Sequence, residues 1–171
     1  MEILLGQKRS IQAILILVLL SKMNGISTSY LTPAFRLDFY YRVFIVGNII
    51  GAKAFYTSHF DFGVAFENEW YIHLVSDTGV QIGFLLPKQP TQPEIFHKPY
   101  NGVGTIFSLE VDNVETAYSE AVEKSLNIVL ELRSEDWGQY HFCIEDPNGI
   151  HLDIIQSFEP TEEYQDGYES E

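Results

Sequence analysis

A chain of 171 residues is long enough for one domain of typical size with short extensions. Hydrophobic residues make up 46% of it and aromatic residues 14%, which is enough to bury a core and argues against a wholly disordered chain. The formal net charge of −14 argues against a nucleic-acid groove or an anionic membrane surface as partner, because phosphates are bound by Lys and Arg side chains.

The first 38 residues differ from the rest and are predicted to form an extension outside the domain. Lys8 and Arg9 precede the apolar run Ile11–Leu20, which is about half as long as a membrane span. Two interpretations stay open. The segment is either a non-native leader or loosely packed extra helix, or a secretory signal or membrane anchor. We expect a cytoplasmic protein, with the signal or anchor as the alternative.

From residue 39 onward the periodicity predicts a strand, a helix and three further strands. Apolar residues fall on one face of the helix predicted for residues 48–60, and Asn48 can cap its first turn. Asn68 and the sequence Asp77–Gly79 are typical of turns between the later strands. The strands are expected at residues 40–46, 62–66, 70–76 and 80–86.

The same order of elements repeats after a Pro-rich connector at residues 88–99. A helix is predicted for residues 113–125, with Asn113 and Thr116 in its capping turn, and Asp146–Gly149 is a turn before the last strand. The strands of this half are expected at residues 105–111, 128–132, 139–144 and 150–156.

Matched residues in the two halves lie 65 positions apart, as in Val46-Gly47-Asn48 and Val111-Asp112-Asn113. We therefore predict an α+β domain over residues 39–157 made of two βαβββ modules, at about 39–87 and 104–157. The acidic tail, residues 158–171, is expected to be solvated and mobile.

Side chains alternate along each strand, so one face packs under a helix and the other carries a mixed set of residues. If the two sheets curve together, the mixed faces meet and predict a pocket for a small organic ligand. Tyr41, Tyr71 and Trp137 would form its walls. The predicted ligand-binding residues are Tyr41, Tyr71, His73, Gln81, Ser108, Glu110, Trp137, Gln139, His141, His151 and Asp153. The alternative is that several of them lie at strand ends or in a subunit interface.

The segments Val46–Phe62, Phe107–Tyr118 and Trp137–Ile154 resemble the vicinal oxygen chelate superfamily. This superfamily includes glyoxalase I, extradiol dioxygenases, fosfomycin-resistance transferases and bleomycin-resistance proteins. The DPNG turn followed by an alternating strand is the most specific part. The resemblance implies the glyoxalase/bleomycin resistance/dioxygenase fold, in which tandem βαβββ modules form a curved mixed sheet around a cavity. It also implies a homodimer that completes its cleft at the subunit interface.

Relatives similar to glyoxalase I are expected to bind a metal ion through four positions, which fall here on Tyr41, Gly83, Ile106 and Asp153. Among these only Asp153 is a good ligand, so we expect no metal cofactor. A relocated site stays open, and its candidate ligands are His73, Glu110, His141, His151 and Asp153.

The preferred hypothesis is a metal-independent protein of the bleomycin-resistance-like branch that binds a small organic ligand. An acidic cavity, with Gln81, Glu110, His141 and Asp153 as orienting groups, would suit a cationic ligand. The alternatives are a glyoxalase-like lyase or dioxygenase with a non-standard metal site, and a regulatory or structural dimer with a vestigial cavity. As a separate hypothesis, Glu110 and His141 could act as an acid–base pair.

The remaining reactive side chains are expected to be structural. Cys143 is the single cysteine and is predicted to be a buried, unreactive thiol. His59 and His97 are predicted to lie at the surface.

Overall fold

The structure of this chain is a computed structural model that describes residues 40–165. The predicted extension at residues 1–38 and the last part of the acidic tail lie outside the described residues. From Tyr41 onward the described residues form one unit. No helix within residues 40–165 is long and apolar enough to cross a membrane.

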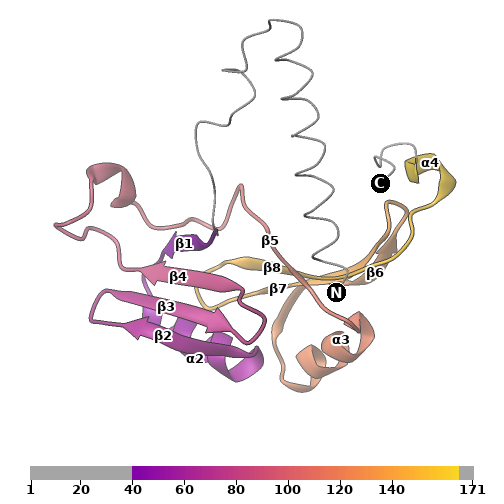
Figure 1. The fold of residues 1–171 in the computed structure, drawn as a ribbon, viewed down its shortest axis with the longest axis horizontal. Helices are drawn as coiled ribbons and strands as arrows, with labels where there is room; N and C mark the ends of the chain where they lie inside the picture. Colours follow the sequence, from indigo (N-terminus) through magenta and orange to yellow (C-terminus); the bar gives the residue numbers. More distant parts are fainter. Residues whose placement is uncertain (1–39, 166–171) are drawn as a thin grey trace, which may run out of the picture. The chain divides into compact units, whose positions relative to one another are not determined.

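The first module is a four-stranded sheet in the order β1-β4-β3-β2, with a helix against one face (Figure 1). Its elements are β1 (Arg42–Ile45), α2 (Ile49–His59), β2 (Phe62–Glu67), β3 (Tyr71–Ser76) and β4 (Gln81–Leu85). β1 pairs in parallel with β4, and the other two pairings are antiparallel. Asn48 caps α2 as predicted, since its side chain accepts a hydrogen bond of 2.8 Å from the Gly51 N–H.

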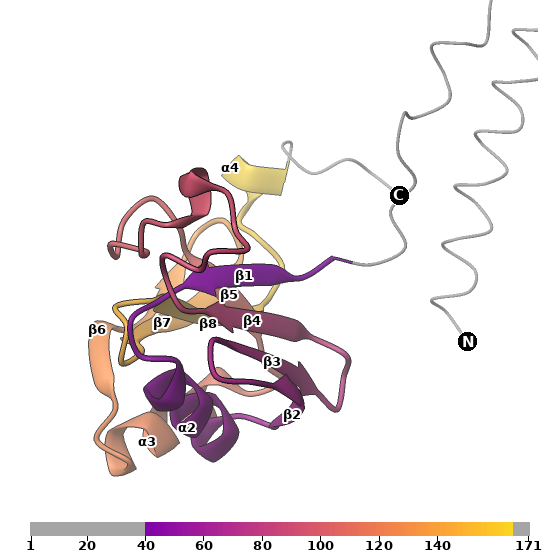
Figure 2. The same cartoon turned by 90° about the vertical axis from the view of Figure 1, so that its left-hand side faces the viewer.

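The second module repeats this arrangement in the order β5-β8-β7-β6, with β5 and β8 parallel. Its elements are β5 (Phe107–Glu110), α3 (Val114–Glu123), β6 (Asn127–Glu135), β7 (Gln139–Glu145) and β8 (His151–Ser157). Asn113 caps α3 through a 2.8 Å bond from the Thr116 N–H. Two sheets with one strand order confirm the predicted α+β fold and its duplication. A 3-10 turn, η2 (Glu94–Phe96), lies in the connector between the modules (Figure 2).

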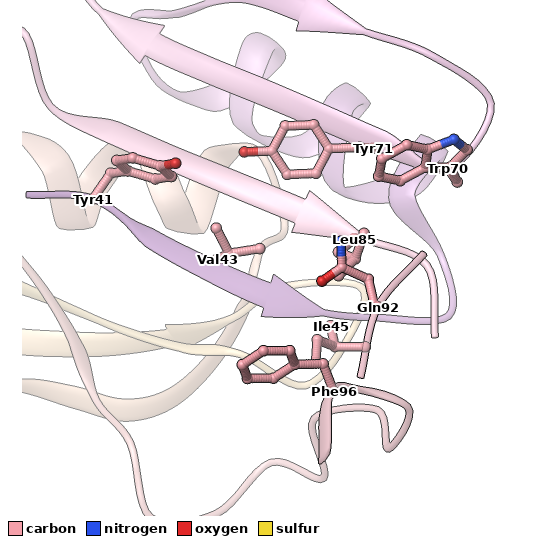
Figure 3. Close-up of a pocket in the computed structure, with 8 residues that line it drawn as sticks. All are labelled: Tyr41, Val43, Ile45, Trp70, Tyr71, Leu85, Gln92 and Phe96. Atoms are coloured by element: carbon pink, nitrogen blue, oxygen red, sulfur yellow. The ribbon is translucent and has the colours of Figure 1, made fainter. Parts of the chain in front are cut away.

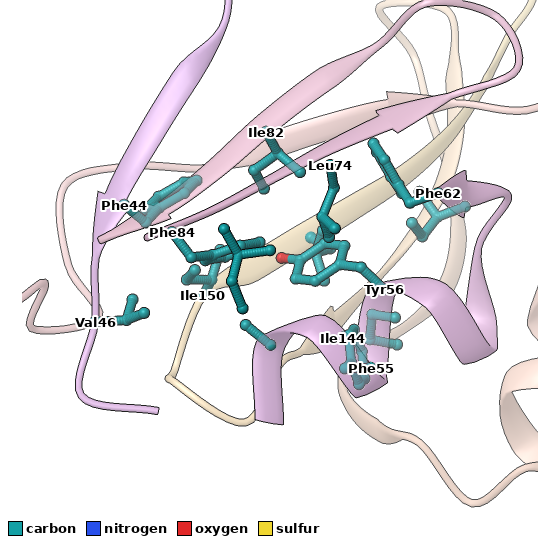
Figure 4. Packing of buried hydrophobic residues seen from close by; sticks show 14 of the residues in the cluster. Phe44, Val46, Phe55, Tyr56, Phe62, Leu74, Ile82, Phe84, Ile144 and Ile150 are labelled. Atoms are coloured by element: carbon teal, nitrogen blue, oxygen red, sulfur yellow. The ribbon is translucent and has the colours of Figure 1, made fainter. Parts of the chain in front are cut away.

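The core lies between the helices and the apolar faces of the sheets (Figure 4). Ile72 and Leu74 of β3 and Phe84 of β4 are fully buried beneath α2. Buried residues of the second module, such as Ile144 and Leu152, belong to the same cluster. Because the modules share one core, each stabilises the sheet of the other.

The DPNG turn joins the two modules by paired hydrogen bonds. The Asn48 N–H donates to Asn148 Oδ1, and Asn148 Nδ2 donates to the Asn48 carbonyl, each over 3.0 Å. Asp146 holds the turn, because its Oδ1 accepts from the Asn148 N–H at 2.7 Å and from the Ile150 N–H at 2.9 Å. A motif identified as a simple turn therefore also fastens the start of α2 to the second module.

Asp146 lies beside the buried ring of Tyr56, which α2 contributes to the core. Neither the Tyr56 hydroxyl nor Asp146 Oδ2 has a hydrogen bond of normal geometry among the described residues. Burial raises the pKa of Asp146 above its ordinary value, since the loss of hydration outweighs the bonds from Ile150 and Asn148. Burial, followed by the Asp146 charge, also raises the pKa of Tyr56.

The part of the acidic tail that the structure describes, residues 158–165, is hydrogen-bonded to the second module, and its mobility stays a prediction. The Phe158 N–H donates to the Gly138 carbonyl at 2.9 Å, and the Thr161 N–H donates to the Asp136 carbonyl at 3.0 Å. Gly138 has φ +93°, and a Cβ there would lie 2.5 Å from the Phe158 oxygen, so only glycine allows this approach. The described tail, which includes the short helix α4 (Glu162–Gln165), is exposed but is tied to the β6–β7 turn.

Candidate functional site

An aromatic cavity of about 500 Å³ opens on the first module (Figure 3). Its walls come from β1, from the start of β3, from the end of β4 and from the connector. The lining residues are Tyr41, Val43, Ile45, Trp70, Tyr71, Leu85, Gln92 and Phe96. None of these lining side chains is charged, in contrast with the acidic cavity expected from the sequence.

Strand alternation explains the β1 wall of the cavity. Phe44 and Val46 are buried in the core, so the odd-numbered side chains of this strand point to the opposite face. That face presents Tyr41, Val43 and Ile45 to the cavity. A single alternating strand therefore supplies both core and site.

Gly83 makes room for the ring of Tyr71 over the sheet. A Cβ at position 83 would lie 2.7 Å from the Tyr71 hydroxyl oxygen and 3.1 Å from Val43 Cγ2. Gly83 pairs with His73 on one side and with Val43 on the other, which places it beneath the cavity wall. The missing side chain thus allows Tyr71 to lie across β4.

A short chain of hydrogen bonds fixes Tyr71 in this position. The Tyr71 hydroxyl lies 3.0 Å from His73 Nδ1, and His73 Nε2 lies 2.9 Å from Gln81 Oε1. With the Gln81 oxygen as acceptor, the His73 Nε2–H donates to Gln81, and His73 Nδ1 accepts a hydrogen bond from the Tyr71 hydroxyl. The Tyr41 ring meets the His73 ring edge to face at 5.0 Å between centroids. Burial, and then the neighbouring Tyr41, raises the pKa of Tyr71, so its hydroxyl stays protonated at neutral pH.

The connector supplies one part of the wall that the sequence did not indicate, and Trp70, Val43 and Ile45 are further lining residues that were not among the predicted ones. His97 Nε2 lies 2.9 Å from the Gln92 carbonyl oxygen and 3.2 Å from the Gln89 carbonyl oxygen, which closes the connector into a loop. Gln92 and Phe96 of this loop face the cavity (Figure 3). His97 was predicted to be a surface residue, but it is half-buried because it makes these contacts.

The other predicted site residues lie in the second module and do not line this cavity. His141, only 8% exposed, lies with Nδ1 2.7 Å from Asp153 Oδ1 and with Nε2 3.4 Å from Glu135 Oε1. Glu135 also forms an ion pair with Arg133. The imidazole is thus held between two carboxylates. The structure does not bring this cluster into the wall that Tyr41 and Tyr71 form.

Four more predicted residues occupy separate places in the second module. Trp137 and Gln139 bond to each other over 2.9 Å at the β6–β7 turn, and His151 Nε2 lies 3.5 Å from Glu145 Oε2. Ser108 is exposed on β5.

Glu110 is likewise exposed on β5, and no bond joins it to His141 as an acid–base pair within the described residues. Cys143 is half-buried, and burial together with Asp153 and Glu145 raises the pKa of its thiol to about 11. The prediction of an unreactive cysteine agrees with this.

A family model described as the Glyoxalase/Bleomycin resistance protein/Dioxygenase superfamily matches residues 38–154. The chain belongs to this superfamily. No curated protein matches the chain.

Solved structures with the same fold share little sequence with this chain. A superfamily member from Sphaerobacter thermophilus is 21% identical, with a TM-score of 0.57 over 71% of this chain and 98% of its own. A glyoxalase/bleomycin resistance protein/dioxygenase from Nocardioides is 12% identical, with a TM-score of 0.64 over 77% of this chain and 90% of its own. A bleomycin-binding protein complexed with bleomycin is 17% identical, with a TM-score of 0.53 over 71% of this chain and 100% of its own.

The four positions at which the sequence resemblance led us to expect the metal site of glyoxalase-like relatives do not carry a fitting set of donors. Tyr71 covers the space above Gly83, Ile106 is an exposed aliphatic side chain, and Asp153 is bonded to His141. Tyr41 brings only a phenol. Within residues 40–165 no three His, Cys, Asp or Glu side chains are grouped so that they could hold a metal ion. The residues present therefore do not fit the metal of those relatives.

Proposed function

We propose that this superfamily member binds a small organic molecule with an aromatic body in the cavity of the first module. The observation that carries the proposal is the cavity itself, in which the rings of Tyr41, Trp70, Tyr71 and Phe96 surround a space of about 500 Å³. Ligand pockets of about 300–1,000 Å³ are typically lined by apolar and aromatic residues with a few placed polar groups.

The wall is preorganised for a flat ligand. Tyr71 is fixed through His73 and Gln81, so it need not be ordered when the ligand binds. The hydroxyl groups of Tyr41 and Tyr71 point toward one another across the cavity (Figure 3) and provide polar contacts for the edge of a ring. Aromatic side chains would contribute through stacking and through burial of about 25 cal/mol per Å² of apolar surface.

A relative with this fold was solved with bleomycin bound, which supports small-molecule binding as one use of the fold. The cavity of this chain differs from our expectation for a cationic ligand because no carboxylate lines it. We also expect a homodimer, which sedimentation equilibrium would test.

Tryptophan fluorescence can test the proposal site by site, since the chain has two tryptophans. The variant Trp137→Phe leaves Trp70 as the single reporter in the cavity wall, and Trp70→Phe leaves Trp137 at the distant β6–β7 turn as the control. We expect saturable titration curves from Trp70 with the neutral probe 2-naphthamide, and no saturable change from Trp137. Bleomycin is the second probe. If neither compound binds at millimolar concentration by fluorescence and by calorimetry, the proposal is wrong.

A further inference from the structure

A second cavity adjoins the first along the outer edge of β1. It has a volume of about 260 Å³ and is lined by Arg42, Val43, Phe44, Ile45, Lys98, Pro99, Tyr100 and Thr105. Val43 and Ile45 line both cavities. Both cavities therefore border β1.

The second cavity gathers positive charge in a strongly acidic protein. Its lining includes Arg42 and Lys98 and no Asp or Glu, although the chain has a net charge of −14. Three of the four other Lys and Arg side chains within residues 40–165 form ion pairs, Lys53 with Glu67, Lys124 with Glu120 and Arg133 with Glu135, and the fourth, Lys88, lines neither cavity. Within residues 40–165 neither Arg42 nor Lys98 forms such a pair. Two uncompensated cations at one cavity point to an anionic ligand group.

Hydrogen bonds place the Arg42 side chain and the connector segment that carries Lys98 at the edge of β1. Arg42 Nη1 donates to the Ile106 carbonyl at 3.4 Å, which uses one of the five guanidinium N–H groups. The Tyr100 N–H donates to the Ile45 carbonyl at 2.7 Å, and this bond fastens the connector to β1 two residues after Lys98. The Tyr100 hydroxyl donates to the Thr105 carbonyl at 3.3 Å. Tyr100 is therefore bonded both to β1 and to Thr105.

The backbone of β1 adds a further donor. The Val46 N–H faces β4, where it donates to the Leu85 carbonyl, whereas the Ile45 carbonyl faces the connector. Because peptide groups alternate along a strand, the Val43 N–H points to the same outer edge as Ile45. The second cavity is thus lined by residues that offer four hydrogen-bond donors: the Arg42 guanidinium, the Lys98 ammonium, the Thr105 hydroxyl and the Val43 amide.

We propose that the ligand of this protein is an aromatic acid, whose ring occupies the aromatic cavity and whose carboxylate or phosphate lies between Arg42 and Lys98. This inference rests on the proposed function and specifies the class of its ligand. It replaces the cationic ligand expected from the net charge, because charge at the site, and not the total, decides recognition.

Three probes that share one ring system separate the two proposals: 2-naphthoate, the neutral 2-naphthamide and the cationic 2-naphthylmethylamine. Titration calorimetry of the full chain at low salt should give 2-naphthoate an affinity at least about tenfold higher than that of the amide. The advantage should shrink as ionic strength rises, since exposed charges are screened. A parallel titration with 2-naphthyl phosphate shows whether the site prefers a carboxylate or a phosphate.

Matched variants locate the charge effect. Arg42→Gln and Lys98→Gln should each weaken 2-naphthoate binding severalfold and leave 2-naphthamide binding unchanged. Lys88→Gln is the control, because Lys88 is exposed in the same connector and lines neither cavity. A cooperative thermal unfolding transition of each variant is the check that it is folded.

The outcomes distinguish the two claims. If the amide binds as tightly as the acid, or the amine binds more tightly, the aromatic-acid inference is overturned while the proposed function stands. If none of the three probes binds at millimolar concentration, the proposed function falls as well. If Lys88→Gln weakens 2-naphthoate as much as Lys98→Gln does, the effect is one of general charge and the anion site is refuted.

Discussion

Replacing Gly83 by alanine should impair the site while leaving the fold intact. The added Cβ would lie 2.7 Å from the Tyr71 hydroxyl, which is closer than side-chain atoms tolerate. The hydroxyl is the far end of a flexible side chain, so the ring would move and the β4 backbone would stay. The Tyr71–His73 hydrogen bond would break as the ring moves.

The size of the effect follows from the contacts that would be lost. One hydrogen bond between side chains contributes about 1 kcal/mol, so the free energy of unfolding should fall by about 1 kcal/mol. A displaced Tyr71 ring would enter the cavity or leave its wall. The loss of one aromatic contact of about 0.5–1.5 kcal/mol would weaken ligand binding by about twofold to thirteenfold.

A second glycine in the same sheet gives a matched control. At Gly63, on β2, an added Cβ would meet only the Val75 oxygen, at 3.8 Å, so Gly63→Ala should keep ligand affinity unchanged. The assays are urea unfolding for stability and calorimetric titration of 2-naphthamide for affinity. The reasoning is refuted if Gly83→Ala binds the probe as tightly as the unaltered protein, or if Gly63→Ala loses affinity to the same extent.

Three further predictions concern the junction between the modules and the cysteine. Asn148→Ala removes both hydrogen bonds to Asn48 and should lower the free energy of unfolding, measured in urea, by about 1–3 kcal/mol. The control Asn101→Ala, at an exposed position, should change that free energy little. The folded-state pKa of Asp146 lies above its ordinary value of 3.8, so its contribution to stability is full below that value and is lost as the pH rises through the folded pKa. Asp146→Asn should therefore gain stability relative to the unaltered protein between about pH 4 and pH 7, and a difference independent of pH in urea unfolding would contradict this. With its pKa at about 11, Cys143 should react with iodoacetamide at about pH 8 roughly 100-fold more slowly than an ordinary thiol. Mass spectrometry measures the rate of alkylation, and a rate as fast as that of an ordinary thiol would show the burial argument to be wrong.

Local signals were enough to predict the fold from the sequence. Asn48 and Asn113 both cap the helices assigned to them, because an Asn side chain at that position satisfies a free N–H of the first turn. Strand alternation and turn residues located every strand, and errors were confined to the ends. β6 runs on to Glu135 because its far end pairs with Gln139 on β7.

The site could be predicted only in part, since its wall combines a strand pattern with a loop. Tyr41 and Tyr71 were placed correctly on the cavity-facing side of their strands, although ligand binding by either stays a prediction. Gln92 and Phe96 carried no signal, because the Pro-rich connector has no periodicity. His97, whose ring closes that loop, looked like any surface histidine.

The expectation of one acidic pocket failed for a different reason. Alternation identified His141 and Asp153 as sharing a face, but it could not show that His141 binds both Asp153 and Glu135. Polar groups satisfied in this way stabilise a sheet without requiring a ligand.

The most direct test of the central claim is a crystal structure of the full chain grown with 2-naphthoate. We expect the naphthalene ring in the aromatic cavity against Tyr71 and Trp70, with its carboxylate within hydrogen-bonding distance of Arg42 or Lys98. A ring bound against the His141 cluster of the second module, or an empty aromatic cavity at saturating ligand, would contradict the account.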